Sequence, residues 1–118
     1  MFSPRDVQLA VFERQIEIAK KTRKPLFLHE RDAHEAFIGV LRKHRPTLTN
    51  KIVVHCFTGS LEQVKEYLEL DCYIGFTGFI CDEREGRGAH LKRVVQAVPL
   101  NRIMIETDGI DVCVVWVY

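Results

Sequence analysis

The chain has 118 residues, enough for one domain with a hydrophobic core but few for a large enzyme. Its 47% hydrophobic and 28% charged residues are ordinary for a globular protein, which excludes a fibrous or low-complexity chain. A formal net charge of +1 gives no overall field that would favour nucleic acid or a membrane surface. Any nucleic-acid partner must therefore be inferred from a site.

The first predicted element is a helix from Arg5 to about Thr22. Its apolar residues recur every three or four positions, as on one helical face: Leu9, Phe12, Ile16 and Ala19. The same spacing predicts three later helices, after about residues 32, 60 and 88. Ser60 with Gln63 has the spacing of a capping box, and Asp32 with Glu35 is an acidic helix start.

Short apolar segments between these helices predict β-strands. They are Pro25–Leu28, Ile52–Val54, Cys72–Phe76 and Arg102–Ile105. Strict alternation of helix and strand predicts a parallel sheet with helical crossovers. The β-branched run Ile52–Val54 is typical of a strand that is buried on both faces.

Residues that can bind a metal ion follow three of the four predicted strands. His29 follows the first, His55 the second, and Glu106 and Asp108 the fourth. The carboxyl ends of parallel strands share one edge of a sheet, so these side chains should converge there. Imidazole nitrogens and carboxylate oxygens together suit a divalent metal ion. Such an ion polarises a phosphoryl or carbonyl oxygen and lowers the pKa of bound water.

Each of these residues also has a structural explanation. A histidine at a strand end is often only hydrogen-bonded, and an aspartate before glycine, as in Asp108-Gly109, often forms a turn. The pattern alone therefore leaves a metal site and a structural role open. A nucleophilic Cys56 activated by His55 is a poorer interpretation, because adjacent strand residues point to opposite faces.

Four segments resemble successive motifs of the TatD family of metal-dependent deoxyribonucleases. They are PLFLHERDA (25–33), VVHCFTGS (53–60), YIGFTGFICDE (73–83) and VPLNRIMIETD (98–108). The resemblance implies an α/β fold, a partial (β/α)8 TIM-type barrel of the metal-dependent hydrolase kind with about four βα units of eight. Residues 1–108 would be its central part, and residues 109–118 a divergent apolar tail.

The resemblance also implies a site. His29, His55 and Asp108 match the family's metal ligands, and Asp108 would also be catalytic. The cofactor would be one or two divalent ions, usually Mg²⁺, with Zn²⁺ or Mn²⁺ as alternatives. Arg31 and Thr58 are candidates either for contacting phosphate or for supporting the ligands beside them, and Glu106 is a candidate for supporting the site or its turn.

The implied function is hydrolysis of DNA phosphodiester bonds by a metal-activated water, with DNA as the partner. The family's N-terminal HxH pair and a later glutamate are missing, and the sequence after Asp108 departs from the family's pattern. We therefore expect a truncated chain with impaired activity. The alternatives are a non-catalytic fragment or interaction module, and a metal-dependent hydrolase of small esters or amides.

The remaining expectations concern the cell and the cysteines. No apolar run reaches membrane-spanning length, and the N-terminus lacks the apolar region of a signal peptide. We expect an intracellular protein without a membrane partner, cytoplasmic or nuclear, and monomeric. The four cysteines form no CxxC motif and are expected to be free thiols.

Overall fold

The computed structural model describes residues 3–82 and 84–107, in which helices and strands alternate. The helices and strands are α1 (Arg5–Thr22), β1 (Leu26–His29), α2 (His34–His44), β2 (Ile52–His55), α3 (Leu61–Glu69), β3 (Cys72–Phe76), α4 (Arg87–Ala97) and β4 (Ile103–Ile105). Short 3₁₀ helices are η1 (Gly78–Cys81), η2 (Arg84–Gly86) and η3 (Leu100–Arg102). The predicted alternation is confirmed.

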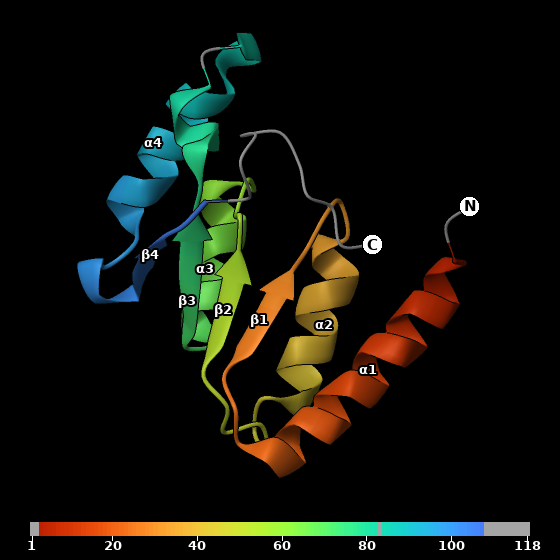
Figure 1. Ribbon diagram of the computed structural model, residues 1–118. Helices are drawn as coiled ribbons and strands as arrows, with labels where there is room; N and C mark the ends of the chain where they lie inside the picture. The colour runs from red at the N-terminus through yellow and green to blue at the C-terminus, as the bar shows by residue number, and fades with distance from the viewer. Residues whose placement is uncertain (1–2, 83, 108–118) are drawn as a thin grey trace.

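The four strands form one parallel sheet in the order β1-β2-β3-β4 (Figure 1). Each strand pairs with the next in sequence, and the register places His29 opposite His55 and Gly75 opposite Met104. All carboxyl ends therefore lie along one edge, as the alternation predicted. Side chains that follow neighbouring strands are brought together at that edge.

The helices cover one face of this sheet. Ile52, Val54 and Ile74 are fully buried against them, in a core that also contains Leu41 and Val64. On the other face, Phe27 is 64% exposed and Met104 is 43% exposed. The Ile52–Val54 strand was predicted to be buried on both faces, and this prediction is wrong. Val53 lies on the face that no described helix covers, and its side chain is only half-buried.

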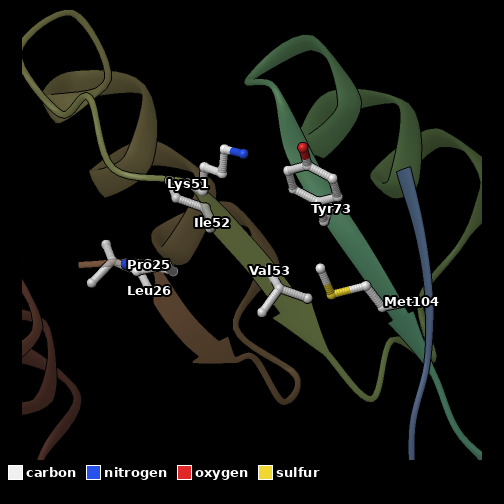
Figure 2. A pocket seen from close by; sticks show the side chains of 7 residues that line it. All are labelled: Pro25, Leu26, Lys51, Ile52, Val53, Tyr73 and Met104. Carbon is white, nitrogen blue, oxygen red and sulfur yellow. The ribbon is translucent and has the colours of Figure 1, made fainter. Parts of the chain in front are cut away.

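A shallow apolar hollow lies on the uncovered face. It has a volume of about 210 Å³ and is lined by Pro25, Leu26, Lys51, Ile52, Val53, Tyr73 and Met104. Figure 2 shows Val53, Tyr73 and Met104 projecting from neighbouring strands toward this space. Several of these residues begin their strands, so the hollow lies toward the end of the sheet opposite to His29 and His55.

Two helix starts were predicted from capping signals, with different outcomes. At α3 the capping box is confirmed: Ser60 Oγ accepts the Gln63 N–H at 3.2 Å, and Gln63 Oε1 accepts the Ser60 N–H at 2.9 Å. The acidic start with Asp32 is wrong, because α2 begins at His34 and Asp32 has a left-handed backbone with φ 53°. Glu30 binds the Ala33 N–H instead.

The segment between β3 and α4 is rich in charged residues. It contains η1 and η2, and α4 begins at Arg87 directly after Gly86, whose φ is 71°. A positive φ of this size favours glycine at that position.

No helix in the described residues is both long and apolar enough to cross a membrane.

Candidate metal centre

His29 and His55 lie side by side at the carboxyl ends of β1 and β2. Their ring centroids are 5.7 Å apart, with an angle of 51° between the ring planes. His29 is exposed, whereas His55 is buried with 9% exposure. The ring of Phe27 packs on His55 with centroids 4.5 Å apart, so both histidines share the uncovered face with Phe27. The predicted convergence of the two imidazoles is present.

Glu106 approaches His55 from the end of β4. Its Oε1 lies 2.8 Å from His55 Nδ1 and accepts the backbone N–H of Cys56 at 2.9 Å. The Glu106 N–H itself donates to the carbonyl of Phe76 at 3.0 Å, which continues the pairing of β4 with β3. Metal-bound histidines commonly have a carboxylate beside the ring nitrogen that does not bind the ion, and Glu106 has this position relative to His55 Nδ1.

Gly75 makes this contact possible. It lies on β3, between the strands that carry His55 and Glu106. A Cβ atom at position 75 would collide with the Glu106 carboxylate. The carboxylate therefore crosses β3 where that strand has no side chain, a reason for glycine inside a strand.

Cys56 turns the chain directly after β2. Its φ of 49° is in the left-handed region, which few non-glycine residues adopt. The side chain is buried, and Sγ lies 3.5 Å from Thr77 Oγ1. The backbone N–H of Cys56 supports Glu106, so its observed part in the site is structural.

Of the other predicted site residues, the structure describes Arg31 and Thr58 but not Asp108. Arg31 and Thr58 are exposed and lie in the segments that follow β1 and β2. The Arg31 Nε lies 3.9 Å from Asp32 Oδ2. Asp108 lies outside the described residues, so its assignment as a ligand stays a prediction. Tail residues 109–118 lie outside them as well.

The donor set suits part of a divalent-metal site. Two imidazole rings from neighbouring strands lie with their centroids 5.7 Å apart, and a carboxylate lies 2.8 Å from a nitrogen of one of them, as is common for metal-bound histidines. Within residues 3–82 and 84–107, no group of three or more His, Cys, Asp or Glu side chains is arranged to hold a metal ion.

Sequence reasoning missed the supporting residues Phe27 and Gly75. Phe27 precedes His29 by two positions, so strand alternation was a usable signal that both lie on one face. Gly75 gave the weaker signal of a glycine inside an apolar strand. Its partner Glu106 is far away in sequence, and only the paired sheet brings them together.

Comparison with known proteins places this geometry in a family. The family described as "TatD related DNase" matches residues 1–110. The 3'-5' ssDNA/RNA exonuclease TatD of Klebsiella pneumoniae is 42% identical over 108 residues, covering 92% of this chain and 40% of the relative. The enzyme of the same name from Rahnella sp. is 45% identical with the same coverage. The chain thus spans about 40% of the length of these relatives.

Solved structures show the fold. The TatD homolog YJJV of Escherichia coli K12 matches with a TM-score of 0.80 and 29% identity, covering 95% of this chain and 42% of that one. An uncharacterized amidohydrolase from Saccharomyces cerevisiae matches with a TM-score of 0.74 and 30% identity, covering 91% and 36%. The four βα units are part of a (β/α)8 TIM-type barrel, which confirms the predicted fold class. The chain belongs to the TatD related DNase family.

Proposed function

We propose that this chain is part of a metal-dependent nuclease that hydrolyses phosphodiester bonds of single-stranded DNA or RNA. The observation that carries the proposal is the pair His29 and His55 at the carboxyl edge of the sheet, with Glu106 against His55. Active sites of (β/α)8 barrels lie at this edge. The names of the curated relatives, 3'-5' ssDNA/RNA exonucleases, supply the substrate class.

His29 and His55 would hold the ion through ring nitrogens, with Asp108 as a third ligand and acceptor of a proton from the attacking water. When bound, a Mg²⁺, Mn²⁺ or Zn²⁺ ion would supply charge that polarises the phosphoryl oxygen and lowers the pKa of water. Whether one or two ions bind depends on ligands beyond the described residues.

The exposed side chains around the pair suit the substrate. Arg31 follows His29 by two residues, and its side chain is 57% exposed, so its guanidinium can form charge-assisted hydrogen bonds to a phosphate group. Thr58 is also exposed and could donate a hydrogen bond to the same class of oxygen. We assign residues 1–108 to the middle of the barrel, as proposed from the sequence.

A hydrolase of small amides or esters is the second candidate. It is favoured by the likeness to the Saccharomyces cerevisiae amidohydrolase, because one barrel fold supports several hydrolytic reactions. A panel of small amides and esters separates the two. Faster turnover of these substrates than of single-stranded DNA would replace the nuclease proposal.

The nuclease proposal is tested by release of nucleotides from labelled single-stranded DNA with Mg²⁺ and with a chelator. We expect metal-dependent release that His55→Ala lowers by about 100-fold, at the upper end of what loss of a partner around a metal site costs. The control is His44→Gln on α2, near the opposite end of the sheet. Release that survives His55→Ala or the chelator would overturn the proposal. Absence of any release would favour a non-catalytic fragment.

A further inference from the structure

A buried hydroxyl links α3 to the loop that follows β1. Tyr67 is fully buried, yet its hydroxyl lies 3.4 Å from Glu30 Oε2 and 3.2 Å from His34 Nδ1. Glu30 comes directly after His29, and His34 opens α2. The hydroxyl therefore touches both ends of the segment that joins β1 to α2.

Glu30 ties this segment together locally. Its Oε1 accepts the Ala33 N–H at 2.7 Å, directly before the start of α2, while its Oε2 accepts from Tyr67. Asp32, which lies between Glu30 and Ala33 in the sequence, adopts a left-handed backbone with φ 53°. A backbone conformation of this kind persists only when its surroundings hold it. The Glu30 carboxylate is one of the groups that hold it.

His34 is the second residue that contacts the Tyr67 hydroxyl. It is buried, its ring meets the Tyr67 ring edge-on with centroids 5.2 Å apart, and its Nε2 lies 3.3 Å from Glu66 Oε1. Arg42 binds the other oxygen of Glu66 at 2.5 Å. Hydrogen bonds from His34 and then Arg42 hold the pKa of Glu66 below its usual range, so it remains an ionised acceptor.

The Tyr67 hydroxyl keeps its proton and therefore remains a hydrogen-bond donor. Burial, followed by the nearby negative charge of Glu30, raises the pKa of Tyr67, so the hydroxyl keeps its proton at every pH at which the protein would work. A phenol can donate one hydrogen bond and accept another. It donates to Glu30, and the direction of its hydrogen bond with His34 Nδ1 depends on the tautomer of the imidazole.

We propose that Tyr67 and His34 are positioning residues for the candidate metal centre: they hold Glu30, and through it they fix His29 beside His55. The two histidines would then be oriented from different sides. Glu106 holds His55 directly from β4, whereas α3 holds the segment that begins at His29. The consequence for metal binding rests on the nuclease function proposed above; the effect on the loop does not.

The test removes only the hydroxyl, with Tyr67→Phe. The aromatic contacts of this ring with Phe37 and Phe57 are kept, so the core stays filled. The matched control is Tyr73→Phe, which removes a hydroxyl from β3 on the uncovered face. Amide hydrogen exchange read by NMR reports the loop without any need for activity.

We expect the Ala33 amide to exchange about five- to tenfold faster in Tyr67→Phe, as loss of one hydrogen bond implies, with amides of β2 and β3 unchanged. Unchanged exchange at Ala33, or equal acceleration throughout the sheet, would overturn the proposal. The variant Glu30→Ala should reproduce the effect, and adding Tyr67→Phe to it should then change little. Additive effects of the two changes would also contradict the proposal.

A second measurement tests the effect of Tyr67 on the candidate metal centre itself. On titration with Mn²⁺, the ring signals of His29 and His55 should both broaden at higher metal concentration in Tyr67→Phe than in the unaltered chain, and at the same concentration as in the unaltered chain in the control Tyr73→Phe. Equal broadening of His29 in both proteins would overturn the positioning role. If Mn²⁺ affects neither histidine in the unaltered chain, the proposed function fails, and exchange at Ala33 still decides the role of Tyr67 in the loop.

Discussion

The Glu106 carboxylate reaches His55 across an intervening strand, with Oε1 2.8 Å from Nδ1. His55 ends β2 and Glu106 follows β4, so β3 lies between them. The contact exists because β3 has Gly75 at the crossing point, where any larger side chain would collide with the carboxylate. Three neighbouring strands thus combine to orient one imidazole.

Replacing Glu106 by glutamine keeps the shape of the side chain and removes its charge. We expect Glu106→Gln to lower the affinity for Mn²⁺ by about 10- to 100-fold, because the imidazole loses the carboxylate that orients it. Titration of the His55 ring signals by NMR measures this. Glu69→Gln, which removes an exposed carboxylate at the end of α3, is the control. Equal affinities of the two variants would contradict this role of Glu106.

Adding one methyl group at position 75 should have a similar result for a different reason. In Gly75→Ala the new Cβ occupies the place of the Glu106 carboxylate, so we expect lower thermal stability as well as weaker Mn²⁺ binding.

The control for this change is Gly39→Ala on α2, where a new Cβ would meet nothing within 4 Å. Alanine is favoured over glycine inside a helix, so this variant should be more stable by about 0.5–1 kcal/mol, measured by denaturant unfolding. A Gly75→Ala protein as stable as the Gly39→Ala protein would mean that the crossing at β3 is not tightly packed.

Stability should fall in alkaline solution. Burial raises the pKa of the Cys72 thiol to about 12, and it also raises the pKa of Tyr67. In the unfolded chain these groups have their ordinary pKa values, about 9 and 10, so they lose protons that the folded chain keeps. Their contribution is therefore complete below about pH 9 and is lost progressively as the pH rises above it.

Thermal unfolding between pH 7 and pH 10.5 checks this expectation. Cys72→Ala should lower the Tm at pH 7, because it leaves a small cavity, and should make the decline above pH 9 shallower. The control Cys81→Ala, on exposed η1, should leave the decline unchanged. A decline as steep in Cys72→Ala as in the unaltered chain would show that this thiol does not contribute.

The sequence was most informative where structure depends on near neighbours. The capping box of Ser60 and Gln63 and the strand Cys72–Phe76 were predicted as observed, because each depends on residues a few positions apart. The cap expected at Asp32 is not formed, because α2 begins at His34 without a side-chain cap. The Glu30 carboxylate instead accepts the Ala33 N–H and the hydroxyl of Tyr67 on α3.

The same distinction between near and distant neighbours in the sequence applies to the candidate site. His29 and His55 could be placed together because strand ends share an edge in a parallel sheet. Glu106 was a candidate for supporting the site, but its contact with His55 could not be predicted, because that contact depends on the absence of a side chain at Gly75, thirty-one positions earlier. Contacts of this kind depend on strand register, which no local pattern of residues encodes.

The most direct measurement is a Mn²⁺ titration followed through the ring signals of the five histidines. His29 and His55 should broaden first and together, because their ring centroids lie 5.7 Å apart at the carboxyl edge. The helix residues His34, His44 and His90 serve as internal controls and should keep sharp signals at that concentration. Simultaneous broadening of all five, or none at His29 and His55, would contradict the metal centre on which the proposed nuclease function depends.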